Sequence, residues 1–186
     1  MTSQDQIFHD LLAEREIHRV LLRYCRGVDR ADEAVIAACF HPDARDDHGN
    51  WLADGASVAR HIVDVIRPGT ARAMHFMGNA LIEVEGDTAF AESYILAFRA
   101  FDRDGVAHNR TRAVRFIDRF ERRDAQWRIS ERVVVDAVGQ PEVRVANRER
   151  LAGNDQQLVL QRLLQEFTEA GRKDPKLEIL DERFKS

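Results

Sequence analysis

Residues 72–101 read RAMHFMGNALIEVEGDTAFAESYILAFRAF, and this stretch decides the class of fold. Apolar and polar side chains alternate on both sides of Gly86 and Asp87, two residue types that favour a tight turn. The pattern predicts two long strands over 72–85 and 88–101, joined at that turn. Two further strands are predicted after it, because short turns follow one another along the chain. They cover residues 108–121 and 126–136.

Helical periodicity comes before these strands, with apolar residues recurring every three or four positions. The three expected helices cover residues 5–28, 32–39 and 56–66. Asp32 is the expected cap of the second helix, a turn over 40–43 closes it, and 44–55 reads as loop or short edge strand. Helices followed by antiparallel strands predict an α+β fold, in which the helices cover the concave face of a curved sheet.

The chain of 186 residues, 44% of them hydrophobic, is long enough for one domain with a substantial core. That domain is expected over residues 1–138. The remaining stretch, 139–186, is more polar and reads as a C-terminal extension with one helix near 155–169. We expect this extension to pack on the domain or on a neighbouring subunit.

Charge and composition exclude several classes of partner. The 28 basic and 32 acidic residues are mixed along the chain and leave a net charge of −4, so nucleic acid is not an expected partner.

No apolar run has the length of a membrane span and the amino terminus is polar, which predicts a cytoplasmic protein. Cys25 and Cys39 lie in apolar helical patterns, as buried and reduced thiols do. No glycine-rich phosphate loop, nucleophile elbow or Cys–His pairing is present, which argues against nucleotide-dependent and acyl-enzyme chemistry. No cofactor is expected.

Five residues of the metal-ligating types fall between the second and third helices. They are His41, Asp43, Asp46, Asp47 and His48. Their spacing fits no ligand motif, and the proline at position 42 breaks any helical register between them. We therefore expect a solvated acidic loop here and no metal site.

Two residues pose the question of function: an acid at the end of the first helix, Asp29, and a strand histidine, His75. Taken alone, Asp29 could cap the next helix through the backbone amides of Asp32 or Glu33. Taken alone, His75 could be a core residue whose ring nitrogens are hydrogen-bonded inside the protein. Helices over a concave sheet would leave a cavity lined by aromatic side chains, a suitable site for a small apolar ligand.

Four stretches together resemble a known family. They are IHRVLLRYCRGVDRAD at 17–32, FHPDARDDHGNWLADG at 40–55, MHFMGNALIEVEGDTAFAESYILAF at 74–98 and IDRFERRDAQWRISERVVVD at 117–136. The chain resembles the SnoaL-like branch of the nuclear transport factor 2-like superfamily over about residues 7–136. That branch includes scytalone dehydratase, lindane dehydrochlorinase, bile-acid 7α-dehydratase and polyketide cyclases. The resemblance implies a cone-shaped, cystatin-like α+β barrel with an apolar pocket, usually in a homotrimer or homodimer.

The resemblance also implies a role for individual residues. His75 matches a general base and Asp29 the carboxylate that orients it, while Tyr24 and Arg132 match positions that bind the reacting oxygen or leaving group. The residues expected to line the substrate pocket are Tyr94, Phe98, Met77 and Phe116. Two alternatives stay open, because Tyr24 fits the apolar stripe of its helix and Arg132 could pair with a neighbour of Glu131 on an exposed sheet face.

The leading hypothesis is a cofactor-independent lyase of dehydratase type, or an isomerase, that acts on a small hydrophobic cyclic substrate through His75 and Asp29. Two alternatives remain. One is a non-catalytic subunit or ligand-binding module, similar to the small subunit of ring-hydroxylating dioxygenases. The other is a polyketide cyclase that uses the same acid and base.

Overall fold

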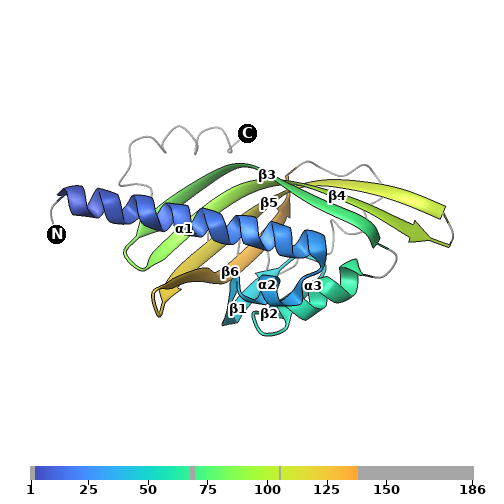
Figure 1. The fold of residues 1–186 in the computed structure, drawn as a ribbon, viewed down its shortest axis with the longest axis horizontal. Coiled ribbons are helices and arrows are strands. Elements are labelled where there is room, and N and C mark those ends of the chain that lie inside the picture. Colours follow the sequence, from blue (N-terminus) through green and yellow to red (C-terminus); the bar gives the residue numbers. More distant parts are fainter. Residues whose placement is uncertain (1–2, 68–69, 105, 138–186) are drawn as a thin grey trace.

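The computed structural model describes residues 3–67, 70–104 and 106–137, which form one curved sheet with a long helix across one of its faces (Figure 1). The helices are α1 (Ser3–Arg30), α2 (Glu33–Ala37) and α3 (Val58–Ile66). The strands are β1 (Phe40–Asp47), β2 (Leu52–Asp54), β3 (Thr70–Glu85), β4 (Thr88–Arg103), β5 (Val106–Arg123) and β6 (Gln126–Asp136). The predicted extension over 139–186 lies outside the described residues.

The sheet has the order β2-β1-β6-β5-β4-β3. Strands β3 to β6 form three consecutive antiparallel pairs, as the turns in the sequence predict. The expectation of a purely antiparallel sheet is wrong at one place, because β1 runs parallel to β6. The predicted turn over 40–43 is also wrong: these residues begin β1, and Ile129 of β6 donates a backbone hydrogen bond of 2.9 Å to the carbonyl of Cys39. The α+β class itself is confirmed.

One face of the sheet, the inner face, packs against α1 and carries Ala91, Ile95, Phe116 and Val134 in one core cluster with the helix. The largest fully buried apolar side chains of this core are Phe40, Phe120, Ile17, Leu21, Ile36, Ile95 and Ile129. The opposite, outer face of β3 and β4 is partly open, since Met74, Phe76, Leu96 and Phe98 are all exposed. The core therefore lies between the sheet and its three helices.

Gly27 lets the end of α1 approach α2 closely. A Cβ at this position would stand 3.0 Å from side-chain carbons of both Val35 and Ile36, tighter than ordinary van der Waals contact. The predicted cap is confirmed, because the Asp32 carboxylate accepts a hydrogen bond of 3.1 Å from the Val35 amide. Asp32 thus begins α2, and the neighbouring carboxylate of Asp29 is left for another partner.

The pairing of β3 with β4 shifts between Met77 and Ala80. Before the shift, His75 and Met77 are half-buried; after it, Ala80 is half-buried while Asn79 is exposed. An extra residue in one strand reverses which alternate side chains face inward. Simple alternation would place Asn79 beside His75, and the bulge prevents this.

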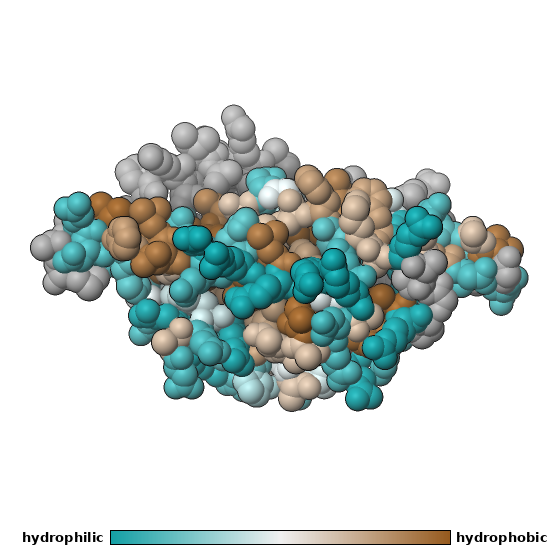
Figure 2. Space-filling model, in the orientation of Figure 1, coloured by the Kyte–Doolittle hydropathy of each residue, from teal (hydrophilic) through white to brown (hydrophobic). Residues whose placement is uncertain are grey.

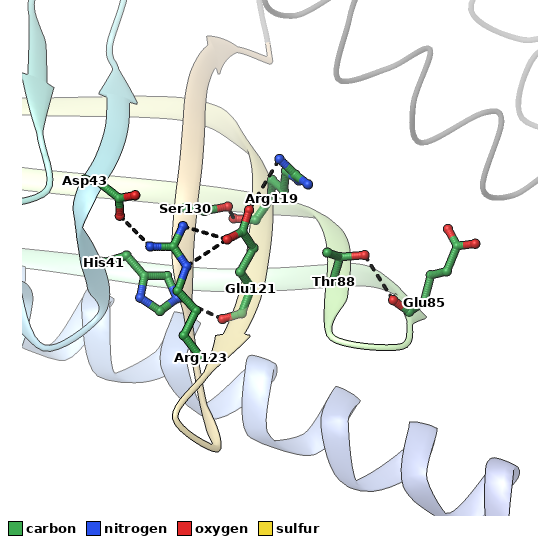
Figure 3. Close-up of polar contacts among 8 residues, drawn as sticks. All are labelled: His41, Asp43, Glu85, Thr88, Arg119, Glu121, Arg123 and Ser130. Carbon is green, nitrogen blue, oxygen red and sulfur yellow. Dashed lines mark hydrogen bonds and ion pairs between the residues drawn. The ribbon is translucent and has the colours of Figure 1, made fainter. Parts of the chain in front are cut away.

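Polar contacts join β1 to the β5–β6 hairpin (Figure 3). The Arg123 guanidinium donates to the carboxylates of Asp43 and Glu121, each at 2.6 Å. His41 Nε2 lies 2.9 Å from the backbone carbonyl of Glu121 and donates to it. The acidic segment is thus a strand, where a solvated loop was expected, and His41 and Asp43 already have partners in β5.

No helix in the described ranges is both long and apolar enough to cross a bilayer. The first turns of α1 nevertheless expose apolar side chains, seen as the brown surface at that end of the helix in Figure 2. They are Ile7, Phe8, Leu11 and Leu12, with 46% to 65% of their surface accessible.

Candidate active site

The last turn of α1 and the middle of β3 bring Asp29 and His75 together. Asp29 Oδ1 lies 2.7 Å from His75 Nδ1. The two side chains keep 19% and 16% of their surface accessible, so the pair sits at the edge of the core and within reach of solvent. The carboxylate that does not cap α2 is therefore bound to the strand histidine, 46 residues away in sequence.

This contact decides the roles of the two ring nitrogens of His75. An ionised carboxylate only accepts hydrogen bonds, so Nδ1 carries the hydrogen and donates it to Asp29. Nε2 then has the free lone pair and can accept a proton. If it does, the Asp29 charge stabilises the imidazolium that forms.

A second acid–base pair lies deeper, on the inner face of β5 and β6. The Arg132 Nε and Nη2 atoms donate to the two carboxylate oxygens of Asp118 at 2.6 and 2.7 Å, and neither side chain is accessible to solvent. Burial lowers the pKa of Arg132, but the Asp118 charge outweighs it and holds that pKa above its ordinary value. Arg132 is therefore a cation at any physiological pH.

Two aromatic rings enclose the Arg132 guanidinium. Its central carbon stands 4.2 Å from the ring centroid of Tyr24 and 4.1 Å from that of Phe116. Burial raises the pKa of Tyr24 far above its usual range, which keeps the phenol protonated. Tyr24 thus supplies apolar surface and a neutral hydroxyl, and Arg132 faces the core, not an exposed sheet face.

Three buried polar atoms near this second pair have no hydrogen-bond partner within the described part of the chain. They are Arg132 Nη1, Asp46 Oδ1 and Ser93 Oγ. Arg132, Asp46 and Ser93 are each fully buried, and an unpaired buried polar group is costly to a fold. Atoms of this kind are suited to bind polar atoms of a ligand.

The inner face links the two pairs step by step along β4. His75 is in register with Ala97, Met77 with Ile95, and Phe116 with Ser93. Accessibility falls in the same order, from the half-buried His75 to Ser93 at 0% and Phe116 at 3%. A row of increasingly buried side chains on this face therefore connects the Asp29–His75 pair with Phe116, whose ring packs on the Arg132 guanidinium.

The substrate-lining residues named from sequence fall on both faces of the sheet. Met77 and Phe116 lie on the inner face with the two pairs. Tyr94 and Phe98 lie on the outer face, because Tyr94 is in register with Arg115 and Phe98 with Met74, whose side chains point away from α1. The structure thus separates Tyr94 and Phe98 from His75.

Asp118 and Ser93 are candidate site residues that sequence reasoning missed, and Asp46 was named from sequence only among five residues of metal-ligating types. Asp118 stands between Phe116 and Phe120, two buried inward-facing positions, and a charged residue in that context needs a buried partner. That signal was present in the sequence. No sequence signal placed Asp46 or Ser93 beside Arg132, because their positions depend on the packing of β1 and β4.

The acidic segment holds its histidines by stacking and hydrogen bonding. His48 Nε2 lies 3.2 Å from Asp46 Oδ2, and the His48 ring stacks on Trp51 with centroids 3.9 Å apart. Across the three described ranges, no three His, Cys, Asp or Glu side chains are arranged to hold a metal ion.

Known proteins with a similar fold were found by comparison of sequence and structure. A family model described as a SnoaL-like domain matches residues 9–133. A hexachlorocyclohexane dehydrochlorinase from Novosphingobium barchaimii is 21% identical, with a TM-score of 0.63 over 73% of this chain and 93% of that one. Two proteins of Novosphingobium aromaticivorans are also similar. One, assigned as a scytalone dehydratase, is 20% identical over 70% of this chain and 91% of its own, with a TM-score of 0.60. The other, NTF2-like with a cystatin-like fold, is 25% identical over 76% and 91%, with a TM-score of 0.56. The search of curated proteins found no match.

Proposed function

Because the chain belongs to the SnoaL-like domain family, we propose that it is a cofactor-independent lyase, or an isomerase, acting on a small and mostly apolar cyclic substrate. The observation that carries the proposal is the 2.7 Å contact between Asp29 and His75 at the edge of an apolar core. Elimination is the favoured reaction, since the names of two similar structures describe a dehydratase and a dehydrochlorinase.

In this proposal His75 Nε2 removes a proton from a substrate carbon. The electron pair of that C–H bond forms a double bond, and the group on the neighbouring carbon leaves with the electrons of its own bond. Asp29 holds the ring in place and stabilises the imidazolium. The leaving group or a developing oxyanion is stabilised by Arg132 Nη1, a buried donor with no partner among the described residues.

The side chains of the inner face support a mostly apolar substrate. Between His75 and Arg132 the inner face presents the side chains of Met77, Ile95 and Phe116, together with one hydroxyl, Ser93. An apolar substrate ring would pack against these three side chains. A carbonyl or hydroxyl at the end of the substrate farthest from His75 would reach Ser93 Oγ or Arg132 Nη1. Tyr94 and Phe98 have no part in this proposal.

The test is turnover of a panel of cyclic alcohols, ketones and halides, followed by chromatography with mass detection. His75→Ala should abolish turnover, and Asp29→Asn should lower kcat by about 10²–10⁴-fold because the ring loses its orienting carboxylate. His108→Ala is the matched control, since His108 is an exposed histidine on β5, and it should keep wild-type activity. A well-folded His75→Ala variant that still turns over substrate would exclude the mechanism.

A non-catalytic subunit is the second candidate, and the outer face of β3 and β4 favours it. Met74, Phe76, Leu96 and Phe98 expose between 36% and 59% of their surface there, and exposed apolar patches are typical of association surfaces. We propose that a second copy of this chain covers this face in a dimer or trimer. Light scattering should then report a smaller particle for Phe76→Glu than for the wild type.

The two candidate functions are separated by activity and assembly together. If the wild-type protein assembles normally but turns over none of the compounds, the non-catalytic subunit is favoured over the enzyme.

A further inference from the structure

One side of α1 carries a row of arginines that the proposed reaction does not use. They are Arg15, Arg19, Arg23, Arg26 and Arg30. Spacings of four, four, three and four residues keep all of them on one stripe of the helix, and every one is exposed. Like charges one turn apart repel each other and weaken a helix, so this stripe lowers the stability of α1.

Arginines elsewhere in the protein form close ion pairs with carboxylates. On the sheet, Arg115 pairs with Glu92 at 2.7 Å and Arg123 with Asp43 at 2.6 Å. No residue in the described ranges forms an ion pair with Arg19, Arg23 or Arg26. The charge of this helix face is therefore not neutralised by the part of the protein that the structure describes.

A groove of about 680 Å³ lies beside the stripe, between α1, the residue after α2 and the β5–β6 turn. Its lining includes Arg19, Arg23 and Arg26 from the helix and Arg128 from β6, together with one carboxylate, Glu16 of α1, so the charged side chains of the groove carry a net positive charge. Figure 2 shows strongly hydrophilic surface over the second half of α1, on the side turned to the viewer. Four guanidinium groups from two separate elements thus meet at one concave surface.

The groove also has apolar surface and defined polar contacts. Leu22, Val20 and Trp127 line it, and of these Leu22 is 46% exposed while the other two are buried beneath it. Arg23 Nε donates to the carbonyl of Arg19 at 3.3 Å, and Arg128 Nη2 donates to the Gln126 side chain at 2.6 Å. These bonds use one donor of each guanidinium and leave the others available.

We propose that this groove binds a small organic anion with a phosphate group attached to an apolar part. Guanidinium groups bind phosphate oxygens in pairs through parallel N–H donors, and several of them together favour a doubly charged group. The volume falls within the range of small-molecule sites, and Leu22 provides a surface for the apolar part. The net charge of −4 opposes the binding of long polyanions.

The experiment is calorimetric titration of the full chain with phenyl phosphate, inorganic phosphate and phenol. Phenyl phosphate should bind more tightly than either of the other two, and 500 mM NaCl should weaken it relative to 50 mM. Arg23→Gln and Arg128→Gln should each raise its Kd at least 10-fold. Arg72→Gln, which removes an exposed arginine on β3 outside the groove, should change Kd less than 2-fold.

The proposal would be overturned if phenyl phosphate did not bind at millimolar concentration, or if Arg72→Gln weakened its binding as much as Arg23→Gln and Arg128→Gln do. It would also be overturned if an RNA 20-mer bound more tightly than phenyl phosphate and the Kd of that RNA were unaffected by Arg128→Gln. Asp29→Asn should leave the affinity for phenyl phosphate unchanged, because its carboxylate is bonded to His75 and does not line the groove. The groove and the proposed active site are thereby tested separately.

Discussion

Two acid–base pairs lie on the inner side of this protein, and they differ chiefly in their exposure. Asp29 and His75 meet at 2.7 Å with 19% and 16% of their side chains accessible. Asp118 and Arg132 meet at 2.6 Å with nothing accessible. The outer pair is joined by one hydrogen bond and the inner pair by two, and the two pairs also differ in the basic group, an imidazole in one and a guanidinium in the other.

An imidazole at the edge of the core can exchange its proton with a substrate or with water. A guanidinium that is fully enclosed between two rings and tied to a carboxylate cannot, and Asp118 holds its pKa above the ordinary value against the effect of burial. The outer pair is therefore equipped to move a proton. The inner pair provides a fixed positive charge, which suits the binding of a developing negative charge.

Removing the carboxylate of the inner pair should have the largest effect on stability. Asp118→Asn leaves the Arg132 charge buried without a partner, which costs about 3–5 kcal/mol in comparable cases. Urea unfolding at pH 7 measures this loss. Asp43→Asn is the matched control, because Asp43 pairs with Arg123 at the surface, and it should lose less than about 1 kcal/mol. Equal losses in both variants would contradict the assignment of the inner pair.

Replacing both members of the inner pair should recover most of that loss. Arg132→Met with Asp118→Leu removes two buried charges together, and such replacements are often neutral or stabilising. Methionine also packs well between the rings of Tyr24 and Phe116. We expect the double variant to be about 2–4 kcal/mol more stable than Asp118→Asn, and to be inactive. A double variant as unstable as Asp118→Asn would show that the pair contributes to stability by more than the mutual neutralisation of its two charges.

Removing the carboxylate of the outer pair should affect stability much less. Asp29→Asn leaves a half-buried His75 ring that water can still reach, so the loss should be under about 1 kcal/mol. Urea unfolding beside Asp118→Asn gives the direct comparison. A loss of several kcal/mol would mean that the outer pair is structural, and would weaken its proposed role in proton transfer.

The outer pair could be foreseen from sequence, but only through the family resemblance. Strand and helix periodicity place His75 in a strand and Asp29 at a helix end, and neither pattern says that residues 46 apart touch. Long-range packing of α1 on β3 makes the contact. The strands themselves were easier to foresee, since alternation and turn residues are local signals.

Which face of each strand the helices cover could not be predicted from the sequence in the same way. A period of two shows which residues share a face, but it does not show which face the helices cover. Tyr94 and Phe98 were expected in the pocket for this reason, and they lie on the outer face. For β1, the sequence predicted a turn over 40–43 and only a loop or short edge strand after it. The pairing of β1 with β6 is parallel and non-local, and the stretch includes a proline, which is unfavourable in a strand interior.

Cys25 gives the most sensitive comparison of the two pairs, with the smallest expected effect. Burial raises the pKa of its thiol to about 11, the Arg132 charge lowers it and the Asp29 charge raises it. Asp29→Asn should therefore lower this pKa, and Arg132→Met should raise it, each by less than about one pH unit. Carbon-13 NMR of the two cysteine β-carbons from pH 8 to above pH 12 measures the change.

Cys39 serves as an internal control in the same spectra. Burial also raises the pKa of Cys39 to about 11, and Arg132 lowers it, but Asp29 is not among the charges that act on it. Arg132→Met should thus move both thiols upward, whereas Asp29→Asn should move Cys25 alone. If Asp29→Asn shifted both thiols equally, the change would reflect altered burial throughout the core, and the electrostatic separation of the two pairs would be lost.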